Sequence, residues 1–178
     1  MSTSCAASKC TQKFEMAPKH VVVLVLGDLG RSPRMQYHAY SIASLNKGRT
    51  THPDSVMVSL VGYEGERVMP IISDNRSIEV FRLKPWDLPY LRFIPMLHAI
   101  AKGIALVFSV IEQLMSLQKF DLVLIQNPPC LPALVAVVLL QFFYRFEIML
   151  DWHNLGFAMF KDRLGEQHML VRLAKFLE

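Results

Sequence analysis

The sequence predicts an α/β protein with a Rossmann-like, doubly wound parallel sheet. Two observations lead to this prediction. Short runs of β-branched and aliphatic residues alternate along the chain with helical segments, as they do where right-handed crossover helices join parallel strands. The 178 residues suffice for one sizeable core and are too few for two full nucleotide-binding lobes. We therefore expect one domain over residues 20–178, preceded by a polar, disordered leader at residues 1–19 that has no apolar anchor.

The expected strands end in loops that contain glycine, proline or polar residues. The first strand, His20 to Leu26, is a buried β-branched run. A glycine turn follows it, and then a helix with Ser32 as the N-cap and Pro33 as its first residue, which ends near residues 46–48. The other strands are expected at residues 55–61, 78–83, 121–126 and 146–151, with further helices from about residue 94 and over residues 131–144.

The composition excludes several classes of protein. The hydrophobic fraction is 52% and the mean hydropathy is +0.29, which is high for a soluble domain, whereas 19% charged residues exclude a purely membrane-embedded chain. The net charge of +4 comes from dispersed Lys and Arg, without the run of like charges that indicates nucleic-acid binding. The three cysteines form no C-x-x-C pair, so we expect neither a disulfide framework nor a metal site.

One segment tests whether the chain enters a membrane. Residues 94–117 are long enough to span a bilayer, but they carry His98, Lys102 and Glu112, which favours a helix that is buried or lies in the membrane interface. The aromatic loop at residues 85–90 could lie at headgroup depth beside it, with Lys102 reaching toward phosphates. The alternative is that the helix simply covers the sheet.

The loop after the first strand is a candidate anion site. Residues 27–34 place backbone N–H groups and a helix N-terminus at the carboxyl end of the strand, with Arg31 and Arg34 available for phosphate oxygens. The loop lacks the G-x-G-x-x-G spacing of NAD-binding folds. An ordinary tight turn is an equally good interpretation.

Two further loops place polar side chains after strands. Gln126 and Asn127 are followed by two prolines that stiffen the loop, so their amides could orient sugar hydroxyls; the alternative is a plain connector to the next helix. Asp151, Trp152, His153 and Asn154 follow the last strand and offer four side chains that can hydrogen-bond or stack. In open α/β sheets ligands bind at this edge.

Three motifs taken together resemble one family. The motifs GDLGRSPRMQYHA, LIQNPPCLP and MLDWHN occur in this order after the first, fourth and fifth expected strands, and they resemble the N-terminal lobe of the chitobiosyldiphosphodolichol β-mannosyltransferases. The resemblance implies a GT-B glycosyltransferase whose N-terminal lobe receives dolichol-diphosphate chitobiose and whose C-terminal lobe binds GDP-mannose, with no further cofactor. It also implies the cytosolic face of the endoplasmic reticulum membrane, with other glycosyltransferases of the dolichol pathway as possible partners.

The roles of single residues are hypotheses based on this placement. Inverting transfer needs a base for the acceptor hydroxyl, and Asp28 and His153 are the candidates, with Asp151 orienting His153. The N–H groups around Gly27 and Gly30 could face the leaving diphosphate. The residues expected to bind substrate are Gly27, Gly30, Arg31, Arg34, Gln126, Asn127, Trp152 and Asn154.

Three functions can be weighed against this sequence. The first is part of the mannosyltransferase, inactive in isolation because the donor-binding lobe is absent from these residues. The second is a non-catalytic module that binds the acceptor or a partner protein. The third, an NAD-dependent oxidoreductase, is disfavoured by the glycine spacing and by Glu79, which is a poor ribose ligand.

Overall fold

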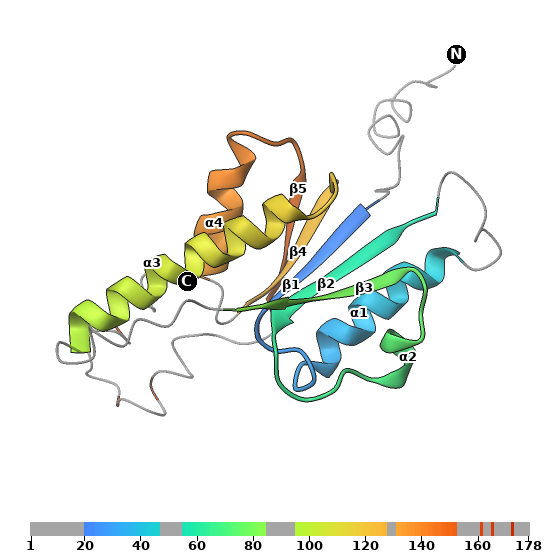
Figure 1. The fold of residues 1–178 in the computed structure, drawn as a ribbon, viewed down its shortest axis with the longest axis horizontal. Helices are drawn as coiled ribbons and strands as arrows, with labels where there is room; N and C mark the ends of the chain where they lie inside the picture. The colour runs from blue at the N-terminus through green and yellow to red at the C-terminus, as the bar shows by residue number, and fades with distance from the viewer. Residues whose placement is uncertain are drawn as a thin grey trace, which may run out of the picture.

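Five parallel strands form a single sheet at the centre of the computed structural model (Figure 1). The structure describes residues 20–46, 55–84, 95–127 and 131–152, together with Lys161, Gly165 and Arg172. The strands are β1 (His20–Asp28), β2 (Met57–Tyr63), β3 (Ile78–Leu83), β4 (Leu122–Asn127) and β5 (Glu147–Trp152). Their spatial order is β3-β2-β1-β4-β5, with β1 and β4 adjacent at the centre. This order confirms the predicted doubly wound fold.

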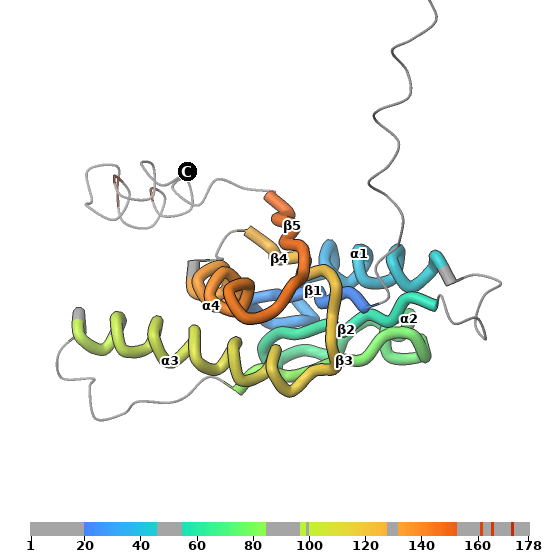
Figure 2. Tube along the Cα trace, turned by 90° about the horizontal axis from the view of Figure 1, so that it is seen from above, coloured from blue at the N-terminus to red at the C-terminus, as the bar shows by residue number. Residues whose placement is uncertain are grey.

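Helices cover both faces of the sheet (Figures 1 and 2). The helices are α1 (Pro33–Ala43), the 3-10 turn η1 (Ser44–Asn46), α2 (Pro70–Ser73), α3 (Pro95–Ser116) and α4 (Leu131–Gln141). The buried residues of α1 and α2 pack on one face, and those of α3 and α4 on the other. In the part of the chain that is described, no helix meets the length and hydropathy needed to cross a membrane.

Strand β1 is buried on both sides, as its sequence predicts. Val21 and Val23 pack in the core beneath α1 and α2, whereas Val22 and Leu24 pack in the core beneath α3 and α4. Successive side chains of a strand point to opposite faces, so a run of aliphatic residues without polar alternation fits only a strand with helices on both sides.

Several element boundaries differ from those predicted. Strand β2 begins and ends two residues later than expected, because it continues in register with β3 as far as Tyr63 opposite Leu83. Helix α4 ends at Gln141 rather than at residue 144, where the N–H groups of residues 142–144 bond to Leu139 and Leu140 and form a turn. Helix α2 was not predicted, because four residues carry no periodic signal.

Ser32 holds the predicted N-cap position, but its hydroxyl does not cap the helix. It donates instead to the carbonyl oxygen of Asp28 at 3.1 Å, and the Gln36 N–H donates to the Ser32 carbonyl. Ser32, which was predicted to cap the start of α1, therefore holds the preceding turn against the end of β1.

Candidate functional site

The strand ends that lead into the three loops singled out by the sequence lie at the same edge of the sheet. Asp28 ends β1, Gln126 and Asn127 end β4, and Asp151 and Trp152 end β5. Helix α1 follows β1 on one face and α4 follows β4 on the other, so the chain turns in opposite directions from the two central strands. This switch point is where doubly wound sheets leave a crevice for ligands.

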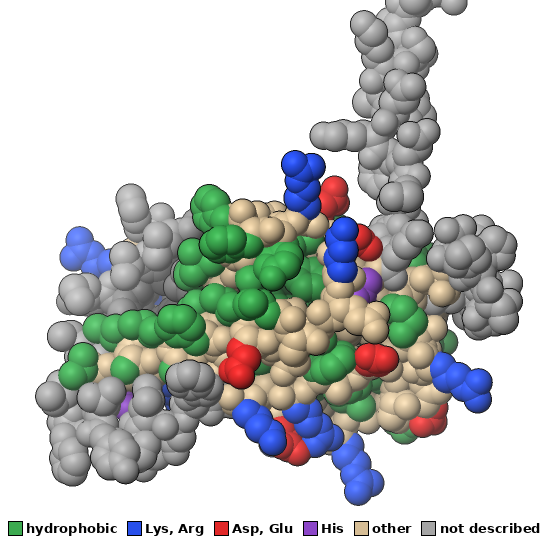
Figure 3. All heavy atoms as spheres, turned by 45° about the horizontal axis from the view of Figure 1, so that its top comes forward, with side chains coloured by type: hydrophobic (Ala, Val, Ile, Leu, Met, Phe, Trp, Pro, Cys, Tyr) green, Lys and Arg blue, Asp and Glu red, His purple; other side chains and the backbone are tan. Residues whose placement is uncertain are grey.

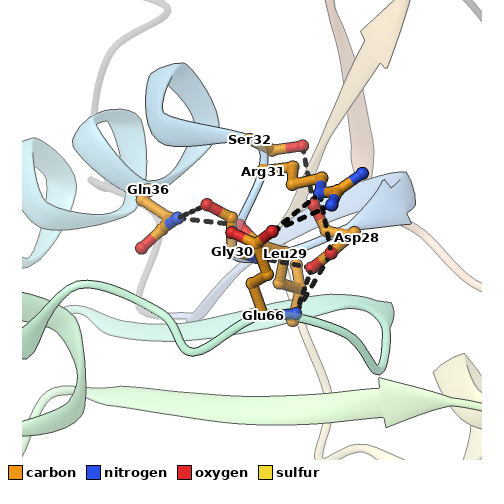
Figure 4. A network of polar contacts seen from close by, with 7 residues as sticks. All are labelled: Asp28, Leu29, Gly30, Arg31, Ser32, Gln36 and Glu66. Atoms are coloured by element: carbon orange, nitrogen blue, oxygen red, sulfur yellow. Dashed lines mark hydrogen bonds and ion pairs between the residues drawn. The ribbon is translucent and has the colours of Figure 1, made fainter.

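The carboxylate of Asp28 joins two loops (Figure 4). Its Oδ1 accepts the N–H of Gly30 at 2.9 Å and the N–H of Glu66 at 3.0 Å, and its Oδ2 lies 3.1 Å from the same Glu66 nitrogen. Arg31 lies 3.7 Å from the Asp28 carboxylate and pairs with Glu66 at 2.9 Å. The turn after β1 is thereby tied to the loop after β2.

These contacts lower the pKa of Asp28 below the ordinary value of an aspartate. The largest cause is the hydrogen bond from the Glu66 N–H, with smaller contributions from Gly30 and from the Arg31 guanidinium. A carboxylate held in this way is a weak base. The geometry thus favours a positioning role for Asp28, while its predicted role as catalytic base stays a prediction.

The turn also differs from the anion site expected of it. The Gly30 N–H is donated to Asp28, and the N–H groups of Arg31 and Ser32 are donated to backbone carbonyls at 3.2 Å. The Arg31 guanidinium is paired with Glu66. A ligand diphosphate would have to displace these internal bonds before it could use the same donors.

Two glycines allow the loops to approach this closely. A Cβ on Gly30 would lie 2.6 Å from backbone atoms of Glu66, and a Cβ on Gly65 would collide with the Asp28 carboxylate. Neither residue has a positive φ, so the requirement for glycine comes from space and not from backbone conformation.

Gly65→Ala is therefore expected to force the Asp28 carboxylate away from the Glu66 N–H. The expected cost is about 1–3 kcal/mol in the free energy of unfolding, measured by urea denaturation. Gly103→Ala is the matched control, because a Cβ on that glycine of α3 meets nothing within 4 Å. The control should gain about 0.5–1 kcal/mol from improved helix propensity. Equal stability of the two variants would contradict the close packing at Gly65.

A second cluster forms around Asp151. Arg34 of α1 donates to both carboxylate oxygens of Asp151, at 2.6 and 2.7 Å, and Nε2 of His38 lies 3.5 Å from the same carboxylate. The Asp151 side chain is only 10% exposed. Arg34 was expected to be available for phosphate, and the structure shows it engaged by Asp151. A fork-like pair of this kind fixes the orientation of both groups.

Gln126 lies beside Asp151, and its amide oxygen is buried. The two residues are in register on β4 and β5, so their side chains share the face covered by α1. The Oε1 atom of Gln126 is buried and has no hydrogen-bond partner among the residues that the structure describes. Buried acceptors are normally satisfied, and a ligand hydroxyl could supply the missing donor.

Asn127 and Trp152 occupy the other face of the same strand ends. They are also in register; Asn127 is buried and Trp152 is about half exposed. The exposed indole is accessible for stacking, and the predicted binding of substrate by Trp152 stays a prediction. His153 and Asn154 lie outside the described residues, so the predicted contact between Asp151 and His153 stays a prediction.

The sequence did not single out Gln36, Gly65 or Glu66. Gln36 is buried; its amide donates to the Leu29 carbonyl at 2.7 Å and accepts the Met69 N–H at 2.7 Å, which joins the turn after β1 to the start of α2. Gly65 and Glu66 follow β2 at the same edge of the sheet. Their position after a strand was a usable signal, whereas nothing local distinguishes Gln36 from other helical glutamines.

The fold and this site define a doubly wound α/β domain with polar side chains gathered at its switch point, and sequence comparison relates it to hexosyltransferases. More particularly, the chain is a homologue of the chitobiosyldiphosphodolichol β-mannosyltransferases, as its motifs indicated. The Yarrowia lipolytica enzyme of that name is 39% identical over 166 residues, which cover 90% of this chain and 33% of the relative. The Dictyostelium discoideum enzyme is 31% identical over 172 residues, covering 89% and 33%.

An Arabidopsis thaliana protein named UDP-glycosyltransferase TURAN is 34% identical over 165 residues, which cover 88% of this chain and 32% of the relative. No family model matches the chain. A domain of a Pyrococcus furiosus hydrogenase superposes on 77% of the chain with a TM-score of 0.41 and 13% identity, which is too slight a likeness to bear on function. The chain spans about a third of the length of the curated relatives that it matches.

Proposed function

We propose that residues 20–178 are the acceptor-side lobe of a β-1,4-mannosyltransferase that transfers the first mannose from GDP-mannose to dolichol-diphosphate chitobiose. The observation that carries the proposal is the cluster of Arg34, Asp151 and Gln126 at the switch point. It offers a fixed carboxylate and a buried amide oxygen that accepts no hydrogen bond from the described residues, and both suit the hydroxyl groups of a sugar. Homology to enzymes named for this reaction supports the choice of substrate.

In this proposal the residues of the site have separate roles in positioning, catalysis and acceptor binding. Asp28 and Gly30 hold the two loops at the mouth of the crevice, and Arg34 holds Asp151 in place. His153, directly after β5, is the better candidate for the base that takes the acceptor's proton, because the pKa of Asp28 is lowered. Gln126 and Asn127 orient the acceptor sugar, and Trp152 stacks on it.

The site of action in this proposal is the cytosolic face of the endoplasmic reticulum membrane, where a dolichol-linked acceptor would lie. Other glycosyltransferases of the dolichol pathway are proposed as partners. The alternative function, a non-catalytic acceptor-binding or partner-binding module, is kept because the chain matches only a third of each relative.

The test is mannosyl transfer from GDP-mannose to phytanyl-diphosphate chitobiose in detergent micelles. Two proteins are compared: the 178-residue chain, and a chimera in which it replaces the matching region of the Yarrowia lipolytica relative. We expect no turnover by the chain alone and turnover by the chimera near that of the parent enzyme. Turnover by the chain alone would overturn the two-lobe proposal, and a folded but inactive chimera would favour the non-catalytic alternative.

A further inference from the structure

The outward face of α3 is more apolar than an ordinary surface helix allows. Large apolar side chains are exposed on it: Leu97, Ile100, Ile104 and Phe108 recur at three- and four-residue spacing, and Met115 follows after the exposed Glu112. The inward face includes smaller residues such as Ala105 and Ser109. A helix of a soluble domain normally directs its largest apolar residues to the core. The arrangement in α3 indicates a second apolar surrounding outside the domain.

Helix α4 extends this apolar surface. It packs against α3 and exposes Val135, Val138 and Leu139. In the turn that follows, Phe142 and Phe143 are 79% and 83% exposed, and Tyr144 is half exposed. Figure 3 shows hydrophobic side chains gathered over α3 and α4 on the left of the view. Contiguous exposed apolar groups of this kind mark an interaction surface.

The end of this surface carries a cavity with positive charge. A cavity of about 250 Å³ lies between the C-terminal ends of α3 and α4, and its lining includes Leu114, Leu140 and Phe146. Lys119 and Arg145 also line it. Arg145 also lines the neighbouring cavity, whose lining includes the acidic residues Asp121 and Glu147, whereas Lys119 lines this cavity alone. Apolar walls beside two cations match an acyl chain with an anionic headgroup.

We propose that the outward face of α3 and α4 docks on a phospholipid bilayer that contains anionic lipids. Phe142, Phe143 and Tyr144 lie at headgroup depth, and Lys119 and Arg145 contact headgroup phosphates. Aromatic residues beside Lys and Arg are the arrangement that binds proteins to the membrane interface. A second copy of the chain fits less well, because a symmetric contact through this corner would bring like charges together.

The proposal names the membrane-facing surface of the lobe, and in that respect it rests on the proposed function. The docking face is the one opposite α1 and α2, so a domain that lies on it holds the carboxyl ends of β1, β4 and β5 at its side, next to the bilayer. Lys119 and Arg145 precede β4 and β5 and therefore contact the bilayer at the opposite edge of the sheet. A lipid-linked sugar could reach the crevice from the bilayer without crossing the domain.

The test is co-sedimentation of the purified chain with vesicles, without sugar donor or acceptor, so that its outcome is separate from that of mannosyl transfer. Vesicles of phosphatidylcholine alone are compared with vesicles that contain about one quarter phosphatidylserine. Phe142→Glu with Phe143→Glu is expected to lower binding to both by roughly tenfold or more. Lys119→Glu with Arg145→Glu should lower binding to the anionic vesicles alone, by roughly tenfold or more.

Matched controls lie on the other face of the domain. Leu45→Glu replaces an exposed apolar residue next to α1, and Arg76→Glu reverses an exposed charge next to α2. Both should bind vesicles as the unaltered chain does, and thermal unfolding checks that all variants fold. Absence of vesicle binding by the unaltered chain, or equal losses in the controls, would overturn the proposal. So would a wild-type oligomer that the Phe142/Phe143 variant converts to monomers with no change in vesicle binding, since that identifies an interface between copies.

Discussion

Arg34→Ala in the chimera is expected to lower mannosyl transfer by roughly a hundredfold, because Asp151 would lose the guanidinium that fixes it. The Asp151 carboxylate is only 10% exposed, so water replaces the lost partner poorly. The Asp151 carboxylate would then change its orientation beside Gln126, which lies opposite it on β4. Steady-state kinetics with the acceptor varied should show a fall in kcat together with a rise in KM.

Two further variants make this result specific. Arg34→Lys keeps the charge and loses the two parallel hydrogen bonds, so an intermediate loss is expected. Arg82→Ala is the matched control: Arg82 is 55% exposed, against 54% for Arg34, but its partner Glu64 is 57% exposed. An exposed pair of this kind contributes little. Similar rates for Arg34→Ala and Arg82→Ala would show that the pair with Asp151 has no part in the reaction.

Asp28→Asn separates the two roles considered for this residue. If Asp28 positions the loops, the amide oxygen can still accept the Gly30 or Glu66 N–H, and transfer should fall by no more than roughly tenfold, with an unchanged pH profile. If Asp28 is the catalytic base, transfer should fall by about 10² to 10⁴-fold and the acidic limb of the profile should change. We expect the first result, because the pKa of Asp28 is lowered by its contacts.

The hydrogen bonds to Asp28 also predict how Asp28→Asn changes the pH dependence of the free energy of unfolding. The folded pKa of Asp28 lies below the unfolded value, so its contribution to stability is full at pH values above about 4 and is lost as the pH falls through the folded pKa. Asp28→Asn should lack that part of the acid-induced loss of stability, as measured by urea denaturation between neutral and acidic pH. An identical pH dependence in both proteins would contradict the hydrogen bonding around Asp28.

The fold could be predicted from the sequence because its signals are local. The run His20 to Leu24 has no polar alternation, and Pro33 stands at the start of the helix that follows it. The strand ends were placed within two residues, and with them the edge where Asp28, Gln126 and Asp151 lie. The short helix α2 left no trace in the pattern because it is a single turn.

The partners within the site could not be predicted, because they depend on long-range packing. Nothing in the sequence links Arg34 to Asp151, which is 117 positions away, or Asp28 to the N–H of Glu66, 38 positions away. Because the sequence does not show these partners, Arg31 and Arg34 were expected to be available to a ligand. In the structure Glu66 pairs with Arg31, and Asp151 pairs with Arg34. The residue types in the loops therefore indicate where the site lies, but they overstate how many charged side chains are free to bind a ligand.

The most direct test of the central claim is calorimetric binding of the two substrates to the 178-residue chain in detergent micelles. The account predicts that phytanyl-diphosphate chitobiose binds, that Arg34→Ala weakens its binding, and that GDP-mannose does not bind. Binding of GDP-mannose without binding of the acceptor would contradict the account, because it would place the donor site in the crevice formed by β1, β4 and β5.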